Sequence, residues 1–347
     1  MILLSIASAL GIVALLLAAG IAYQRHGLRQ DRRRLLPPGR FVTMAGRRLH
    51  VYERGRGEPA VIFESGLASS SLSWYPVQQL VADATRTVSY DRAGIGWSDE
   101  GVAPRTVSGM LDDLAGVLKS SGIRSPYVLV GHSFGALLVR AYASLKKEEV
   151  AGLVLVDPVS VDLWADCTGE NEKRLRLGAK LSRRGVFLAN IGLVRFALAA
   201  LASGKTRLPQ AVAKASAGKA MGTMSRLTGV VQKLPSSLRP SVQSHWSQAK
   251  SFRAMAEYLE ILPRCATEVR SMELSSDLPL TILSASNATA QELAERELWV
   301  QKSVRGRHVQ IPGSTHWMHL EHPEQVALAI LAMVGSAGQG SDPRSAL

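Results

Sequence analysis

The stretch "YVLVGHSFGALLV", residues 127–139, constrains the fold of this chain more than any other. Four apolar residues lead into "GHSFG" (131–135), and a second apolar run follows. The glycines leave room for a sharp strand-to-helix turn with a serine at its tip, so a buried strand, a turn and a helix are predicted. A serine hydroxyl is a poor nucleophile unless a base takes its proton. The stretch therefore predicts a nucleophilic Ser133 and requires a base, an acid and oxyanion donors elsewhere.

From residue 41 onward the chain alternates between strand and helix patterns. Short apolar runs that end at Gly or Pro, such as "AVIFESG" and "VAGLVLVDP", are typical of buried parallel strands, and stretches with helical spacing lie between them. This order predicts an α/β fold with a mostly parallel sheet and helices on both faces. The order is interrupted by a helical stretch without clear strands. The sequence thus predicts a core of 41–157 and 278–335, a helical insertion or lid of 158–277, and a mobile tail of 336–347.

The N-terminus carries a long apolar run. Residues 2–23 contain no charge, and 22 residues span about 33 Å as a helix, enough for a bilayer core of roughly 30 Å. A transmembrane anchor over 1–23 is therefore predicted. A cleaved signal peptide is the alternative: the small residues near Gly20 and Ala22 leave it open. The missing basic n-region and the length of the run disfavour it.

A basic segment, 24–40, follows the apolar run as a juxtamembrane linker. It holds six arginines against a single acid, Asp31, and Pro37-Pro38 marks its end. The positive-inside rule then places the N-terminus outside and the main domain in the cytoplasm. The arginines could also hold anionic headgroups, and a merely solvated linker is the simpler interpretation.

The net charge of +13 indicates an acidic partner, and most of the excess lies in the insertion. Between 158 and 276 there are 18 Lys/Arg and 8 Asp/Glu, so the insertion is predicted to be basic and amphipathic. Contact with an anionic membrane is favoured over a solvated lid. Nucleic acid is not expected, because aromatic and basic residues do not interleave. The apolar run 186–202 is short and carries Asn190 and Arg195, so a lid helix is predicted there and not a second span.

The two cysteines, Cys167 and Cys265, form no metal-binding motif. We therefore expect no metal and no cofactor.

A base for Ser133 is expected on a loop late in the chain, after the last strand. His316 in "IPGSTHWMHLEHPEQV" is the first histidine after the predicted strand "HVQIPG". His319 and His322 are its rivals, and they are expected to orient the loop or to start the last helix. His316 is the predicted base.

The oxyanion donors should be two backbone N–H groups. One belongs to the residue after the nucleophile, Phe134. The other is expected in the loop after "AVIFESG", at Leu67 or next at Gly66.

These pieces together resemble the α/β-hydrolase fold family over roughly residues 41–335. The likeness rests on "FESGLASSSLSWYPV", "SYDRAGIGWSD", "GHSFG", "LVLVDP" and the His316 loop. It is similar to the branch of serine hydrolases with a Y-D-R-x-G-x-G-x-S turn. Many relatives have His-Gly where this chain has Ser65-Gly66. The oxyanion donor is a backbone N–H group, so it does not depend on that histidine side chain. Asp91 and Arg92 of that turn are expected to serve structure.

The acid is the least obvious member. In most members of the family it follows the strand after the lid, but here "LPLTILSAS" is followed by Asn287 and no aspartate. Asp157, at the tip of the strand before the lid, is the predicted acid, since strand tips at this edge point to the ligand crevice. Glu292 on the next helix is an alternative, as is a site oriented by Asn287 or without an acid. Glu292 and Glu295 are expected to be solvated.

The resemblance implies a serine hydrolase that cleaves carboxylic esters through an acyl-enzyme. A serine nucleophile argues against the branches that use aspartate, the epoxide hydrolases and haloalkane dehalogenases. The anchor and the apolar, basic lid favour lipid-like or acylated substrates at the membrane. The alternatives are a non-catalytic binding protein at the membrane, or an acyltransferase or thioesterase on the same site.

Overall fold

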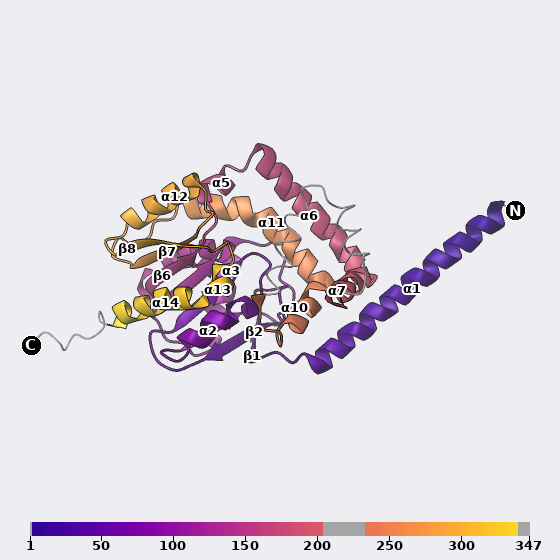
Figure 1. The fold of residues 1–347 in the computed structure, drawn as a ribbon, viewed down its shortest axis with the longest axis horizontal. Coiled ribbons are helices and arrows are strands. Elements are labelled where there is room, and N and C mark those ends of the chain that lie inside the picture. The colour runs from indigo at the N-terminus through magenta and orange to yellow at the C-terminus, as the bar shows by residue number, and fades with distance from the viewer. Residues whose placement is uncertain (1, 204–232, 339–347) are drawn as a thin grey trace, which may run out of the picture.

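The computed structural model of the protein describes residues 2–203 and 233–338 (Figure 1). Residues 204–232 of the predicted helical insertion and most of the predicted tail lie outside the described residues.

The core is one twisted sheet, whose strands in the described residues are arranged in the order β1-β2-β4-β3-β5-β6-β7-β8. The first two form an antiparallel hairpin, β2 also pairs antiparallel with β4, and the remaining pairs are parallel. The strands are β1 (Arg40–Met44), β2 (Arg47–Arg54), β3 (Val61–Glu64), β4 (Thr87–Tyr90), β5 (Tyr127–His132), β6 (Val150–Val156), β7 (Leu280–Ala285) and β8 (Gly306–Ile311). The predicted α/β-hydrolase fold is confirmed.

Helices cover both faces of the sheet and form two separate cores with it. Alternate residues of β5 serve the two sides: Leu129 belongs to the core under α3 and α4, and Val128 and Val130 to the core under α2 and α14. This is why the central strand is apolar throughout. These helices and the short segments beside them are η1 (Ser71–Trp74), α2 (Tyr75–Val81), α3 (Val107–Ser120), α4 (Phe134–Leu145), η2 (Lys147–Glu149), α12 (Ala290–Gln301), α13 (Met318–Glu321) and α14 (Pro323–Gly338).

The described part of the insertion between β6 and β7 consists of helices joined by short turns and contains no strand. Its helices are α5 (Val161–Ala165), α6 (Gly169–Asn190), α7 (Leu193–Ser203), α10 (Arg239–Trp246) and α11 (Ala249–Arg270). The long helix α11 packs against α6 on one side and against α4 of the core on the other. The predicted helix over 186–202 is in fact two helices that meet at a corner, where Gly192 has φ +77°.

The N-terminal helix α1 (Ile2–Arg34) is longer than the apolar run that starts it. It continues through the arginines of the predicted linker, and only a short extended segment joins it to β1 (Figure 1). Within the described residues it is the one helix long and apolar enough to cross a membrane, a property that an N-terminal signal sequence shares.

Candidate active site

Ser133 lies at the tip of a sharp turn between β5 and α4, with φ +53°. Both glycines of the motif are required by close packing. A Cβ on Gly131 would lie 2.7 Å from the Cα of Ala136, and one on Gly135 would lie 2.4 Å from the carbonyl oxygen of Glu64. Gly131 therefore lets β5 and α4 meet closely, and Gly135 lets α4 approach the end of β3, so that the turn places a strained serine at the carboxyl end of the sheet.

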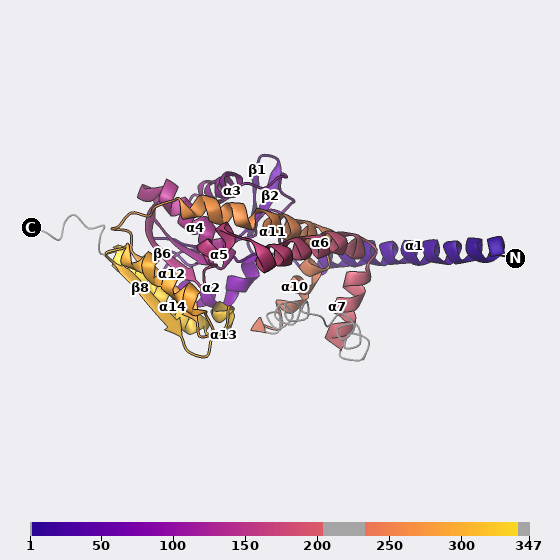
Figure 2. The same cartoon turned by 90° about the horizontal axis from the view of Figure 1, so that it is seen from above.

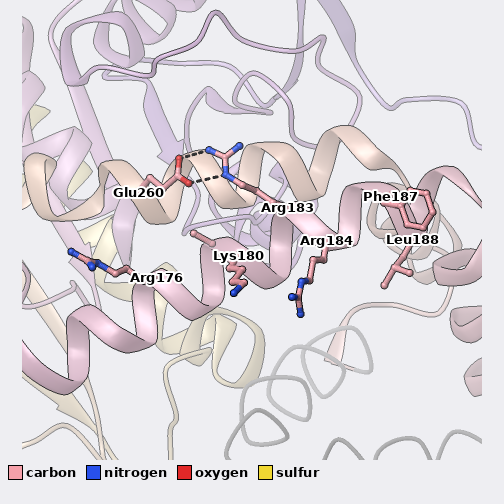
Figure 3. A pocket seen from close by; sticks show the side chains of 8 residues that line it. Arg176, Lys180, Arg183, Arg184, Phe187, Leu188 and Glu260 are labelled. Carbon is pink, nitrogen blue, oxygen red and sulfur yellow. Dashed lines mark hydrogen bonds and ion pairs between the residues drawn. The ribbon is translucent and has the colours of Figure 1, made fainter.

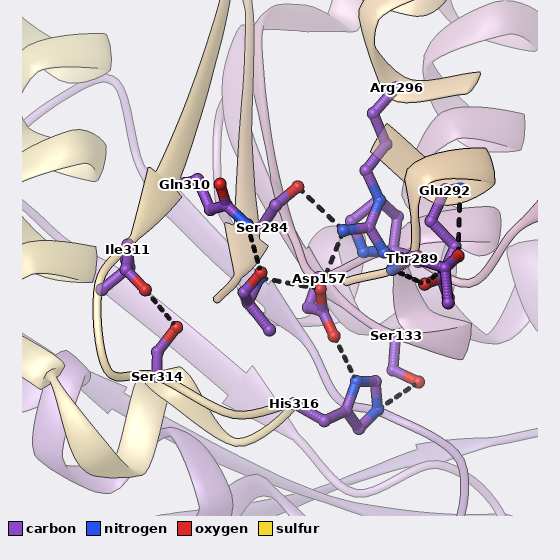
Figure 4. A network of polar contacts seen from close by, with 12 residues as sticks. Ser133, Asp157, Ser284, Thr289, Glu292, Arg296, Gln310, Ile311, Ser314 and His316 are labelled. Atoms are coloured by element: carbon purple, nitrogen blue, oxygen red, sulfur yellow. Dashed lines mark hydrogen bonds and ion pairs between the residues drawn. The ribbon is translucent and has the colours of Figure 1, made fainter. Parts of the chain in front are cut away.

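Three side chains from distant parts of the sequence form a hydrogen-bonded chain (Figure 4). Ser133 Oγ lies 3.0 Å from His316 Nε2, and His316 Nδ1 lies 2.6 Å from Asp157 Oδ2. A carboxylate can only accept, so Nδ1–H donates to Asp157 and leaves Nε2 as the acceptor for the serine hydroxyl. The structure thus brings together the predicted nucleophile, base and acid in the order that proton transfer needs.

Asp157 directly follows β6, with φ +41°, and is 7% exposed. Its second oxygen accepts hydrogen bonds from Arg296 Nη1 at 2.9 Å and from the backbone N–H of Ala285 at 3.1 Å. Burial opposes the charged form, but the hydrogen bond from His316 and the charges of His316 and Arg296 outweigh it and hold the pKa of Asp157 below its usual range. Asp157 is therefore ionised at neutral pH. The contact of Arg296 with Asp157 was not predicted, because the sequence does not distinguish a buried arginine of α12 from a solvated one.

The other acids lie away from His316. Glu292 is half-buried and caps α12, accepting from the backbone N–H of Thr289 at 2.8 Å. The expectation that Glu295 is solvated was wrong: it is 7% exposed and accepts from the backbone N–H of Val161 at 2.7 Å. It is buried because α12 packs against the first turn of α5. Asn287 is exposed in the loop after β7.

The loop after β3 lies directly against the serine. A Cβ on Gly66 would lie 3.5 Å from Ser133 Cβ and 2.7 Å from His132 Nδ1, so only glycine fits there. Arg92 Nη2 donates to the carbonyl oxygen of Gly66 at 2.6 Å. In a trans peptide the following N–H, that of Leu67, points the opposite way, away from Arg92.

The amide of Phe134 is the first of α4. The first amides of a helix have no acceptor within it, which leaves this N–H available at the serine.

The buried Arg92 fixes the loop after β3 through several hydrogen bonds. It also donates to Ser65 O and forms an ion pair with Glu64, which in turn accepts from the hydroxyl of Tyr90. Burial raises the pKa of Glu64, although Arg92 and Tyr90 oppose that effect.

Asp91 holds the neighbouring turn. It accepts from the backbone N–H groups of Ser71 at 2.7 Å and Trp97 at 2.9 Å and lies 3.0 Å from His50 Nδ1. In the structure, both residues of the Asp91-Arg92 pair brace turns beside the site.

Two further histidines lie beneath His316. His132 Nε2 lies 2.8 Å from the carbonyl oxygen of His316, so its ring holds the backbone of that loop. Burial, followed by the neighbouring histidines, lowers the pKa of His132 well below its usual range, and burial lowers that of His319 to about 3. Both are therefore neutral, and His132 Nε2–H is the donor to that carbonyl. The sequence predicted His316 rather than His319 as the base, but it did not predict the contact of His132 with the His316 loop.

A small cavity of about 50 Å³ lies between the loop after β3 and the insertion. Its walls include Leu67, His245 and Trp246, together with Trp317, the neighbour of His316. A much larger open groove of about 860 Å³ lies between α6 and α11 (Figure 3), and none of the residues lining it belongs to the hydrogen-bonded chain of Ser133.

Residues 59–323 match the family model for the alpha/beta hydrolase fold. Since that match covers most of the chain, the protein belongs to the α/β-hydrolase family. The YqjL protein of Bacillus subtilis is 35% identical over 121 residues, which is 35% of this chain and 48% of that protein. The chain thus matches about half the length of this curated relative.

Two solved structures are similar in fold. A putative epoxide hydrolase from Pseudomonas aeruginosa has a TM-score of 0.63 at 18% identity, with 86% of this chain and 96% of that chain covered. A thermophilic esterase from Thermogutta terrifontis has a TM-score of 0.54 at 19% identity, with 86% and 97% covered. At such identities the likeness concerns the fold.

Proposed function

We propose that this protein is a serine hydrolase that cleaves carboxylic esters through an acyl-enzyme. The observation that carries the proposal is the chain from Ser133 Oγ through His316 to Asp157, with contacts of 3.0 Å and 2.6 Å. Ser133 is the nucleophile, His316 the general base and Asp157 the acid that orients it.

In the proposed mechanism, His316 Nε2 accepts the hydroxyl proton as Ser133 attacks the ester carbonyl. The Asp157 carboxylate stabilises the imidazolium that forms, and Arg296 keeps that carboxylate ionised. The N–H groups of Phe134 and Leu67, with Gly66 next, donate to the oxyanion. His316 then gives its proton to the leaving alkoxide. In the second half of the reaction, water attacks the acyl-enzyme while His316 accepts its proton, and His316 returns that proton to Ser133 Oγ as the carboxylic acid leaves.

The nucleophile separates this proposal from other chemistries of the fold. The turn after β5 presents a hydroxyl at Ser133 where epoxide hydrolases and haloalkane dehalogenases would use a carboxylate. A serine hydroxyl forms an ester with an acyl group, which favours acyl substrates. The proposed membrane location favours a lipid-like acyl chain, and Val242 and Leu234 give the small cavity apolar walls that would contact part of such a chain.

We also propose that α1 anchors the protein in a membrane, with the hydrolase domain in the cytoplasm and the helical insertion as a lid. The apolar residues of α1 up to Leu17 are exposed, as a membrane span requires. The arginines that follow favour the cytoplasmic side.

A fluorophosphonate probe tests the catalytic part of the proposal. Such probes phosphonylate only an activated serine, so the full-length wild type should become labelled and Ser133→Ala should not. Ser69→Ala, also beside the cavity, is the matched control and should label like the wild type. Absence of labelling in the wild type would favour a non-catalytic binding protein instead. A series of model esters of increasing acyl length then measures chain preference.

A further inference from the structure

The helix α1 docks on the insertion along one face. Burial begins at Gly20 and recurs at Gln24 and Gly27, at the spacing of a single helix face. A Cβ on Gly20 would lie 2.3 Å from the carbonyl oxygen of Ile191, and one on Gly192 would lie 2.6 Å from that of Gly20. The backbones of α1 and of the corner between α6 and α7 are therefore in direct contact.

A polar network on the same face holds the contact. Arg195 of α7 donates to Gln24 Oε1 at 2.9 Å and to Asp31 Oδ2 at 2.7 Å. From α10, Ser244 Oγ donates to Asp31 Oδ2 at 2.6 Å, while the carbonyl oxygen of Ser247 accepts from Gln24 at 2.9 Å. Two helices of the insertion are thus fixed to the last four turns of α1.

This junction sets the height of the insertion above a membrane. Residues 2–19 of α1 are all exposed. At 1.5 Å per residue they span about 27 Å, close to the hydrocarbon thickness of roughly 30 Å. A bilayer crossed by α1 therefore ends near Gly20, and the corner at Ile191 and Gly192 lies at the level of the headgroups.

Helices α6 and α7 both run across the axis of α1. Figure 1 shows α6 on the outer side of α11, on the side toward which α1 extends to its N-terminus, and Figure 2 shows α7 crossing the direction of α1. With α1 along the membrane normal, both helices lie along the membrane surface. The outward face of α6 is then turned to the bilayer.

That outward face combines basic and apolar side chains. Lys180 and Arg184 point away from α11 in Figure 3 and, within the described residues, form no ion pair. Leu177, Phe187 and Leu188 are exposed by 53%, 59% and 37%. The acids on or near the helix are neutralised by neighbours in the pairs Glu170–Arg174, Glu172–Arg176 and Glu260–Arg183. Exposed cations beside exposed aromatic and aliphatic groups are the pattern of an interfacial helix.

We propose that the outward face of α6, with Phe196 of α7 beside it, rests on the anionic headgroups of the bilayer that α1 crosses. Phe196 is 63% exposed. The inference rests on the proposed membrane anchoring and adds a second, specific contact to it. It also bears on the substrate path, because α10 both holds α1 through Ser244 and lines the cavity with His245 and Trp246. The small cavity that α10 lines is then held at a fixed height above the lipids.

Fluorescence quenching in vesicles tests the contact with the full-length protein. In a Cys167→Ser background, a thiol-reactive fluorophore is placed at Leu188→Cys, and Cys265 stays buried. In phosphatidylcholine vesicles with phosphatidylserine, a lipid with a nitroxide near the headgroup should quench this label. The same label at Leu298→Cys, 60% exposed on α12, should keep its fluorescence. Equal fluorescence of the Leu188 label with and without the nitroxide lipid would overturn the proposal.

Charge reversal tests the basis of the contact. Lys180→Glu with Arg184→Glu should weaken quenching at position 188, because the docked α1 still holds α6 near the lipids while the attraction to anionic headgroups is lost. The exposed pair Lys302→Glu with Arg307→Glu changes the net charge equally and should leave quenching intact. If both pairs of substitutions reduced quenching equally, the effect would depend on net charge alone. The proposed contact through this face of α6 would then be overturned.

A label at Leu10→Cys with a nitroxide deep in the acyl chain reports the anchor separately. Quenching at position 10 without quenching at 188 contradicts only the surface contact. Loss of quenching at position 10 contradicts the anchoring.

Discussion

At the scale of residues, two members of the proposed triad share an unusual backbone. Ser133 and Asp157 have φ +53° and +41°, a region that costs a residue with a Cβ about 1–3 kcal/mol. Neighbouring strands hold both: Ser133 N donates to Val156 O at 3.1 Å, and Asp157 N donates to Leu283 O at 2.7 Å. Glycines in sequence made the serine turn predictable. No such signal marks Asp157, which was inferred from its place at a strand tip.

The role of Asp157 is open to direct measurement. Asp157→Asn should lower kcat by up to about four orders of magnitude, because the amide cannot hold the required histidine tautomer or stabilise an imidazolium. Glu292→Gln is the control and should stay near wild type, since Glu292 caps α12. Initial rates with a model ester measure both. A nearly active Asp157→Asn together with an inactive Glu292→Gln would reverse the assignment.

At the scale of elements, apolar runs predicted the central strands because β3, β5 and β7 are buried on both faces over their whole lengths. Helices of the insertion were harder. A single helix over 186–202 was expected, but Gly192 turns the chain there to let the corner meet α1. The burial of Glu295 was also not predicted, because it depends on the contact of α12 with the start of α5. Both errors arise from contacts between distant segments, which periodicity in one segment does not encode.

Two of the glycines of α1, Gly20 and Gly11, allow a matched test of the junction. Gly20→Leu keeps the helix apolar but places a side chain against Ile191, whereas a Cβ on Gly11 has no heavy atom within 4 Å. Overpacking costs about 1–3 kcal/mol, so amides of α7 should exchange roughly 5- to 150-fold faster in Gly20→Leu. Gly11→Leu should exchange like the wild type. Hydrogen exchange with mass spectrometry in lipid nanodiscs measures this, and equal rates in the two variants would mean that the junction does not stabilise α7.

At the scale of the whole molecule, the positive charge of the insertion and the apolar surface of α1 both favour a position at a membrane. The insertion carries most of the excess positive charge, and α1 fixes that insertion next to the end of its exposed apolar segment. Composition predicted the basic insertion and the apolar helix separately. The sequence did not predict that the basic insertion and the apolar helix are in contact. That contact depends on α1 remaining helical to Arg34 and on Arg195 binding it.

The orientation of the anchor follows from the arginines after the apolar run, and it can be measured in cells. Val304, in the turn before β8, is 74% exposed and lies in the hydrolase domain. In a Cys167→Ser background, Val304→Cys should react with a membrane-impermeant maleimide only after the cells are permeabilised, because the positive-inside rule puts this domain in the cytoplasm. Ile2→Cys, at the other end of α1, should react in intact cells. Labelling of Val304→Cys in intact cells would place the domain outside. The contact of α6 with lipid would stand even then, because it depends on the docking of α1 and not on which leaflet the domain faces.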